Sequence, residues 1–257
     1  MERRITMNAL RRYLVRPQDA RSPAEPRRDA SEGNVSEGDL SGRSVPGRDV
    51  PERSVSGRCD LCGVPVADDH RHLIDLSSRE IRCACRPCAT LFDRAERGGQ
   101  RYRAVPDRRW YLRGFALDDA AWDGLHIPVQ MAFFFHDSSA RRAVLHYPSL
   151  GGPVESPLAR PTWARLEAAN PVLGGLAPDV EALLVNRTGD ARDHWIVPID
   201  DCYALVGLIR TRWKGLAGGP DVWREIGGFF TALRGRSRTV DAGGGTHDGN
   251  RPEGAKQ

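Results

Sequence analysis

The stretch CDLCGVPVADDHRHLIDLSSREIRCACRPCATLF (residues 59–92) holds five of the chain's six cysteines and two of its seven histidines. Two C-x2-C pairs in it are separated by 22 residues. This separation is close to the spacing of four-cysteine zinc sites. The spacing therefore predicts one tetrahedral metal site. Its predicted ligands are Cys59, Cys62, Cys85 and Cys88.

Three further residues of this stretch are alternative ligands, namely Cys83, His70 and His72. In an extended strand, Cys83 lies about 6.6 Å from Cys85 and points to the same side, so it can replace Cys85 if the second turn is irregular. Otherwise Cys83 is a core residue or a neighbour of the metal ligands. The two histidines can bind the metal or lie near a four-sulfur site without binding it.

A complete shell of four thiolates leaves no open coordination position, so bound water cannot be activated. We therefore expect a structural zinc ion. Metal binding contributes roughly 10–16 kcal/mol in zinc peptides, and a module of this size with few large apolar residues needs such a contribution. Iron or an iron–sulfur cluster is the alternative cofactor, and it would make the protein an electron carrier.

The residues around the cysteines predict a small fold. RHLIDL (71–76) and EIRCAC (80–85) have the pattern of two strands joined by a turn, and Pro87 is suited to the first turn of a helix that follows. A turn with two cysteines, a hairpin, and a helix that supplies the last ligands is a treble-clef arrangement. Treble-clef nucleases carry a histidine on the hairpin and a further ligand on the helix, but this helix offers only Asp93 and Glu96.

Composition divides the 257-residue chain into five segments. Residues 1–16 are expected to contain a short helix, and residues 17–57 a disordered linker with the five-residue repeats EGNVS, EGDLS, GRSVP, GRDVP and ERSVS. Each repeat has a single aliphatic residue, which is too little to form a core. The cysteine module spans residues 58–99, an α+β domain spans 100–235, and residues 236–257 are expected to be a disordered tail.

The larger domain alternates between strand and helix patterns, with hairpins followed by helices. This order predicts helices packed on a mainly antiparallel sheet, which is an α+β fold. The predicted strands are 101–106, 108–115, 129–137, 141–149, 180–187 and 194–200, and the predicted helices are 118–125, 161–170, 202–213 and 222–233.

No catalytic constellation is recognised in the larger domain. Cys202 has no histidine within a few residues and is expected to be a buried structural cysteine. Asp200 and Asp201, beside it, are most simply a helix N-cap and a first-turn acid. The other histidines are spread over separate elements without metal-ligand spacing. The sequence therefore favours a non-catalytic protein over an enzyme.

The formal net charge of +4 is small for a chain of this length, and only Lys214 and Lys256 are lysines. Apart from an arginine-rich N-terminus, no broad basic face is evident, so a nucleic-acid partner is not favoured. The first residues lack the apolar core of a secretory signal, and no apolar run is long enough to span a membrane. A cytoplasmic location is expected, where clustered cysteines are typical of metal binding.

The order of motifs resembles an uncharacterised family, a domain of unknown function, from high-GC Gram-positive bacteria. Its members are typically encoded next to genes of high-affinity nickel–iron hydrogenases. The resemblance implies an accessory or maturation role with a protein partner, such as hydrogenase subunits or maturation factors, and it implies no activity. Besides the cysteine stretch, the matching motifs are ALRRYLVRP, RYRAVPDRRW, IPVQMAFFFHDS, YPSLGGPVES, DVEALLVNR and VPIDDCYALVGLIRTRWKG.

Overall fold

The computed structural model describes residues 55–93, 101–213 and 218–243. The predicted N-terminal helix, nearly all of the predicted linker and the chain after residue 243 lie outside these ranges. Within them, no helix has both the length and the apolar character needed to cross a membrane.

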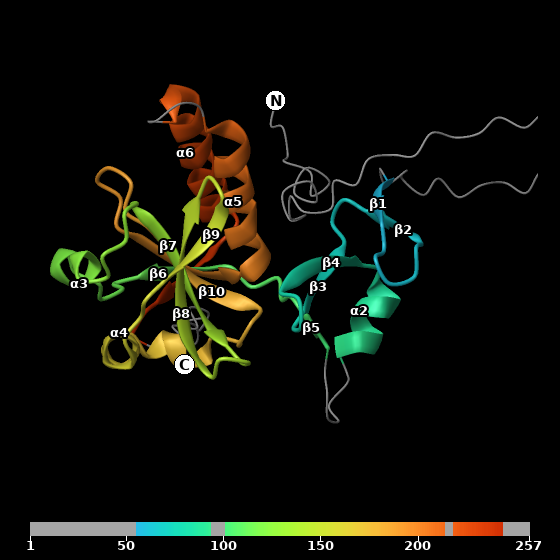
Figure 1. Cartoon of the computed structure of the whole chain (residues 1–257), viewed down its shortest axis with the longest axis horizontal. Coiled ribbons are helices and arrows are strands. Elements are labelled where there is room, and N and C mark those ends of the chain that lie inside the picture. The colour runs from blue at the N-terminus through green and yellow to red at the C-terminus, as the bar shows by residue number, and fades with distance from the viewer. Residues whose placement is uncertain (1–54, 94–100, 214–217, 244–257) are drawn as a thin grey trace, which may run out of the picture.

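The cysteine-rich part consists of two small sheets and a helix (Figure 1). β1 (Val55–Arg58) and β2 (Pro65–Ala67) form an antiparallel pair. A second sheet has the order β4-β3-β5 and is antiparallel throughout. Its strands are β3 (Arg71–Asp75), β4 (Glu80–Ala84) and β5 (Tyr102–Ala104), and the helix that follows β4 is α2 (Arg86–Asp93).

The apolar core of this part is small. Only Leu73, Ala84 and Ala89 form its buried cluster, with a few half-buried side chains, among them Phe92, packed around it. Two of the three buried residues are alanines, which bury little area. The hydrophobic effect therefore contributes little to the stability of this part of the chain.

The rest of the chain forms a seven-stranded sheet with the order β12-β6-β11-β10-β7-β8-β9. Every neighbouring pair is antiparallel except β12 and β6, which run parallel. The chain is therefore of the α+β type with mainly antiparallel sheets. The strands are β6 (Trp110–Arg113), β7 (Met131–Asp137), β8 (Arg142–Ser149), β9 (Gly152–Ser156), β10 (Glu181–Asn186), β11 (Asp193–Pro198) and β12 (Arg238–Asp241).

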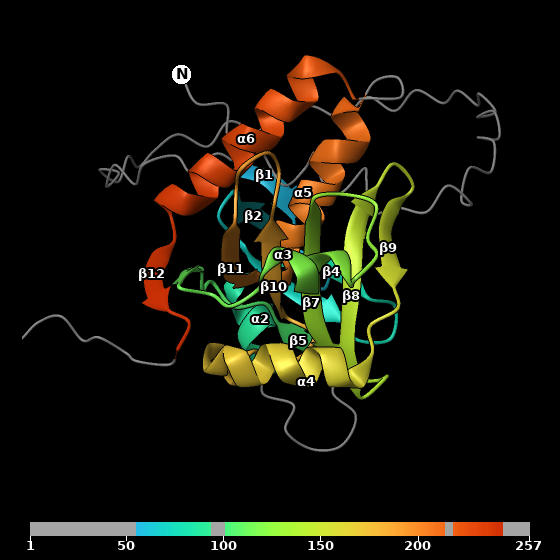
Figure 2. The same cartoon turned by 90° about the vertical axis from the view of Figure 1, so that its left-hand side faces the viewer.

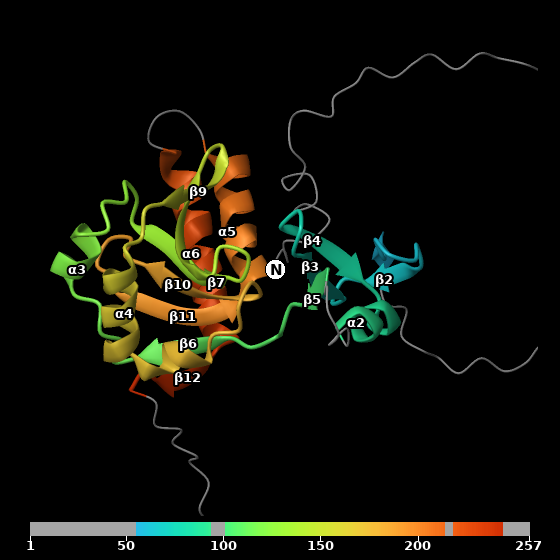
Figure 3. The ribbon, with the colours of Figure 1, turned by 60° about the horizontal axis from the view of Figure 1, so that its bottom comes forward.

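Helices cover both faces of this sheet (Figures 2 and 3). Alternate residues of β7 show the division, because Phe133 belongs to one core cluster and Phe134 to the other. All six residues of the central strand β10 are buried, as expected for a strand covered on both sides. One face carries α5 (Ile199–Arg212) and α6 (Gly219–Gly235), and the other carries α3 (Asp119–Asp123), α4 (Arg160–Ala169) and the 3-10 helix η2 (Pro171–Gly175).

The expectation of disorder from residue 236 onward is wrong for the first part of that segment. Residues 238–241 form β12, which pairs with β6, and Asp241 accepts two hydrogen bonds from the guanidinium of Arg113. Ala242 is buried against the sheet. The predicted linker similarly ends earlier than residue 57, because β1 begins at Val55. Both strands are short and are stabilised by a partner strand rather than by an apolar run of their own.

A buried carboxylate joins the cysteine-rich part to the large sheet. Asp179 is 0% exposed and accepts hydrogen bonds from Arg79 at 2.6 Å and from Arg103 at 2.9 Å. Arg79 lies in the turn between β3 and β4, and Arg103 lies in β5. The backbone N–H of Ser138, beyond the end of β7, donates to the same carboxylate at 3.0 Å. Asp179 therefore connects three segments that are distant in sequence.

A buried histidine makes the stability of the fold depend on pH. His194 stacks on Phe115 with 4.4 Å between the ring centroids, and burial together with the nearby Arg187 lowers the pKa of His194 to about 4. Because the unfolded chain binds this proton near pH 6.5, the contribution of neutral His194 to stability is complete above pH 6.5 and is lost as the pH falls towards 4. The His194→Phe variant keeps the stacking and removes the titration.

Between pH 7 and pH 4.5, the free energy of unfolding of the native protein should fall by about 2.5 kcal/mol more than that of the His194→Phe variant. Urea denaturation at the two pH values measures this difference, and groups common to both proteins cancel in it. The exposed His126 provides a control, since His126→Asn should leave the pH dependence as in the native protein. Equal losses in all three proteins would contradict the prediction.

Candidate metal centre

Two turns present the four cysteines of the C-x2-C pairs. Cys59 and Cys62 lie in the turn between β1 and β2, where the N–H of Cys59 donates to the carbonyl of Val64 at 2.8 Å and the N–H of Gly63 donates to the carbonyl of Cys59 at 2.9 Å. Gly63 has a φ of 75°, in the left-handed region that glycine adopts without strain. The turn thus brings the first pair of thiols to one side.

The second pair lies where β4 ends and α2 begins. Cys85 precedes the helix and its carbonyl accepts the N–H of Ala89 at 2.9 Å, while Cys88 lies in the first turn. The first turn of α2 contains no acidic residue. The partial positive charge of the helix N-terminus therefore acts on the cysteine sulfurs without a competing carboxylate.

The four sulfurs lie within 4.8 Å of one another, close enough to bind a metal ion. The sulfurs of Cys62 and Cys85 are 3.7 Å apart. With metal–sulfur bonds of 2.3 Å, a regular tetrahedron has an edge of about 3.8 Å, which matches this separation. All four cysteines are free of disulfide bonds. The site is formed by Cys59, Cys62, Cys85 and Cys88, and we call it the four-cysteine site.

The electrostatics of these thiols are uneven. Burial opposes the ionisation of Cys59, which is 3% exposed. Backbone hydrogen bonds from Cys85, Leu61 and Cys62 outweigh burial and lower the pKa of the Cys59 thiol to about 6. Burial and the neighbouring thiols, first of all Cys85, raise the pKa of Cys88. The Cys59 thiol therefore ionises readily, and a bound cation would offset the interactions that raise the pKa of Cys88.

Cys83, His70 and His72 do not join this site. They form a second group, in which one ligand atom from each residue lies within 4.8 Å of the others. Burial lowers the pKa of His72, but the carboxylate of Asp200 and the sulfur of Cys83 raise it to about 9. For the Cys83 thiol, burial raises the pKa, but the two histidines outweigh burial and lower the pKa to about 7. The two imidazoles and the thiol therefore interact electrostatically, and a metal ion would compete with protons for the same three atoms.

Of the two roles predicted for the carboxylates at the start of α5, the N-cap is wrong, whereas the position in the first turn is confirmed. The N-cap position of α5 is Pro198, without a side-chain cap. Asp200 accepts a hydrogen bond from His72, and Asp201 is paired with Arg109 and Arg236. Both carboxylates therefore bind side chains from distant segments of the chain. A capping rule considers only neighbouring residues and cannot predict these contacts. The contact of Asp200 with His72 of the second group was not predicted from the sequence.

Two other reactive side chains, those of Cys202 and His146, pack against the apolar residues of the large sheet. Cys202 is completely buried, and burial followed by Asp201 and Asp200 raises the pKa of its thiol. His146 stacks against Phe133 and Phe135 in the core.

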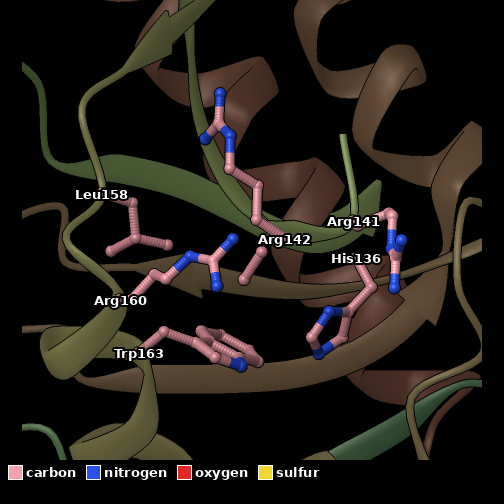
Figure 4. A pocket seen from close by; sticks show the side chains of 7 residues that line it. His136, Arg141, Arg142, Leu158, Arg160 and Trp163 are labelled. Atoms are coloured by element: carbon pink, nitrogen blue, oxygen red, sulfur yellow. The ribbon is translucent and has the colours of Figure 1, made fainter. Parts of the chain in front are cut away.

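One pocket of about 170 Å³ lies beside α4 and β8 (Figure 4). Arg142 in its wall is paired with Glu155. The wall carries arginine, histidine and apolar side chains and includes no carboxylate. It is lined by His136, Arg141, Arg142, Ala143, Leu158, Arg160 and Trp163.

Comparison with known proteins identifies a family to which the chain is similar. The model of a family of unknown function (DUF5947) matches residues 58–237, which include both cysteine groups and nearly all of the large sheet. No curated protein and no solved structure matches the chain.

Proposed function

Because the chain belongs to this family of unknown function, its role has to be inferred from the site, and we propose that it is a non-catalytic accessory protein with one structural zinc ion. The supporting observation is the convergence of four free thiols from two turns, with a sulfur–sulfur distance that fits a tetrahedral ion. The proposed ligands are Cys59, Cys62, Cys85 and Cys88.

The chemistry of the four thiols favours zinc in a structural role. Soft thiolate ligands in tetrahedral geometry are typical of Zn²⁺, and a four-thiolate shell has no position for water or substrate. The apolar core around Leu73 is small and contributes little to the stability of the module. Metal binding is therefore expected to supply much of the free energy that holds the two cysteine turns together.

The order of elements supports a treble-clef fold for the cysteine module. A turn with one cysteine pair precedes the β3–β4 hairpin, and a helix with the other pair follows it. We propose that residues 58–99, together with β5 (Tyr102–Ala104), which pairs with β3, are a metal-stabilised unit attached to the α+β domain. That domain was expected at residues 100–235, and with β12 it extends to residue 241.

The proposed partner is another protein. The module exposes apolar side chains, with Leu91 of α2 68% exposed and Val64 45% exposed, and a partner that covers them would remove apolar surface from water. The motif resemblance described above supports a hydrogenase context, with hydrogenase subunits or maturation factors as partners. Reduced thiols at a metal site fit a cytoplasmic location.

Metal analysis of protein purified without oxygen tests the proposal. We expect zinc bound at the four-cysteine site and a colourless protein without an electron paramagnetic resonance signal, because Zn²⁺ has a filled d shell. Substitution by Co²⁺ should give the intense ligand-field bands of a tetrahedral thiolate site. The Cys88→Ser variant should lose this metal, whereas the Cys202→Ala variant should keep it, since Cys202 lies in the core of the large sheet.

A coloured protein with stoichiometric iron would contradict the proposal. The same four sulfurs would then form a rubredoxin-like centre or hold an iron–sulfur cluster, and the protein would be an electron carrier or a cluster-handling protein. Tight binding of DNA or RNA at low salt would instead favour a nucleic-acid-binding treble clef, since phosphate contacts are strongest there.

A further inference from the structure

The β3–β4 hairpin brings His72 and Cys83 opposite each other. The backbone of Cys83 is bonded elsewhere, because its N–H donates to the carboxylate of Asp60 at 2.7 Å and its carbonyl accepts the N–H of Asp60 at 2.8 Å. His72 and Cys83 are therefore a pair without mutual backbone hydrogen bonds, the type in which facing side chains come closest. His70, two residues before His72, lies on the same face.

Each imidazole is held through its Nδ1 atom. Nδ1 of His70 lies 2.6 Å from the carbonyl oxygen of Ala67, and Nδ1 of His72 lies 2.9 Å from Oδ2 of Asp200. A carbonyl and a carboxylate can only accept hydrogen bonds, so Nδ1 carries the proton in both neutral rings. The lone pair of each ring is therefore on Nε2. Metal-binding histidines in proteins are typically oriented in this way.

The two Nε2 atoms are both buried and have no hydrogen-bond partner among the described residues. A buried polar atom without a partner is unfavourable and calls for an explanation. The Cys83 thiol has only one proton and can serve one of the two nitrogens. A cation bound by both nitrogens and by the sulfur satisfies all three atoms at once, and the ligand atoms already lie within 4.8 Å of one another.

We propose that His70, His72 and Cys83 bind a second metal ion through two imidazole nitrogens and one thiolate. This ligand set suits Zn²⁺ and similar divalent transition metals. Three protein ligands leave the fourth tetrahedral position for water or a small anion, in contrast to the closed four-cysteine site. The ion at the second site is therefore able to exchange and to act as a Lewis acid. The proposal goes beyond the structural role of the first site, because it concerns a different set of ligands, although it rests on a folded module.

Asp200 is a positioning residue for this second site. It lies in the first turn of α5, which packs on the large sheet, and it orients His72 from there. When a histidine that binds a metal donates its other ring N–H to a carboxylate, the carboxylate fixes the orientation of the ring and raises the basicity of the ligating nitrogen. Asp60 holds Cys83 from the turn between Cys59 and Cys62. The second site is therefore connected both to α5 and to the turn that carries Cys59 and Cys62.

Metal counting on the full-length, reduced protein tests the proposal. After anaerobic loading with Zn²⁺ and gel filtration, the native protein should hold one equivalent more than the Cys83→Ser and His70→Ala variants. These variants should keep the metal of the four-cysteine site and an unchanged far-UV circular dichroism spectrum. With Co²⁺ as the probe, the thiolate charge-transfer band of the second equivalent should disappear in Cys83→Ser. Asp200→Asn should weaken binding of the second equivalent about 10–100-fold.

The matched control is His126→Asn, because His126 is exposed and lies outside both groups. This variant should bind as much metal as the native protein. Equal metal content in the native protein and in Cys83→Ser would overturn the proposal, and so would an equal loss in His126→Asn. Failure of the proposed zinc site is distinguishable from failure of the second site: in the first case the Cys83→Ser variant would be folded and hold no metal, and in the second case it would hold as much metal as the native protein.

Discussion

Removing the metal from the four-cysteine site is expected to unfold residues 55–93 while the seven-stranded sheet stays folded. The proposed ion contributes binding energy of roughly 10–16 kcal/mol in comparable peptides, which exceeds what a small core can supply. That core consists of Leu73, Ala84 and Ala89. The large sheet, in contrast, has two extensive apolar clusters, one on each face. Loss of the metal should therefore act locally.

The distribution of aromatic residues makes this outcome easy to measure. All six tryptophans lie between residues 110 and 223, so tryptophan fluorescence reports only on the large sheet. Addition of a strong chelator, or the Cys88→Ser variant, should leave the emission maximum unchanged while NMR amide signals of residues 55–93 collapse to the range of unfolded peptides. The Cys202→Ala variant with metal bound serves as a control. Retention of dispersed signals from β3 and β4 without metal would contradict the structural role.

Replacing Asp179 by asparagine is expected to lower the free energy of unfolding by about 3 kcal/mol. Asp179 is completely buried and pairs with Arg79 and Arg103, so the uncharged side chain leaves Arg103 without its counter-ion and leaves Arg79 paired with Asp137 alone. Asparagine has nearly the same shape and tolerates the φ of 67° found here. The substitution therefore removes the charge without adding backbone strain. Urea denaturation measures the change.

An exposed ion pair provides the matched comparison for Asp179. Arg142 and Glu155 are joined across β8 and β9 with side chains 37% and 47% exposed, and Glu155→Gln should change the free energy of unfolding by less than about 1 kcal/mol. Similar effects of the two substitutions would show that Asp179 does not stabilise the contact between the cysteine module and the sheet. Hydrogen exchange in β5, which carries Arg103, should rise in the Asp179 variant only.

The elements that the sequence predicted are those with strong local patterns. The alternation in residues 129–149 predicted the β7–β8 hairpin, and the apolar run in 180–187 predicted β10. The strands that it missed carry no such pattern. β12 has the sequence RTVD with no buried residue, and β9 is buried only at its two ends. Their positions are set by the neighbouring strands, which a reading of the local sequence does not include.

In the candidate site, too, local spacing in the sequence was predictive, whereas contacts between distant residues could not be predicted. The spacing of the two C-x2-C pairs was sufficient to identify four cysteines that lie together. Cys83 differs from Cys85 because β4 ends between them, so Cys83 faces His72 while Cys85 is turned towards the helix. The H-x-H spacing of His70 and His72 was a usable signal for a group of their own. Asp200, which is 128 residues from His72, could not be paired with it from the sequence.

The parallel pairing of β12 with β6 has a consequence for synthesis of the protein in the cell. Arg113 and Asp241, which are bonded across this pair, are 128 residues apart. Translation proceeds from the N-terminus, so one edge of β6 stays open on the ribosome until residue 241 has been made. An open strand edge in a nascent chain can pair with other chains. The cysteine hairpin can close early on the ribosome, whereas the large sheet is expected to reach its final form only after translation has passed β12.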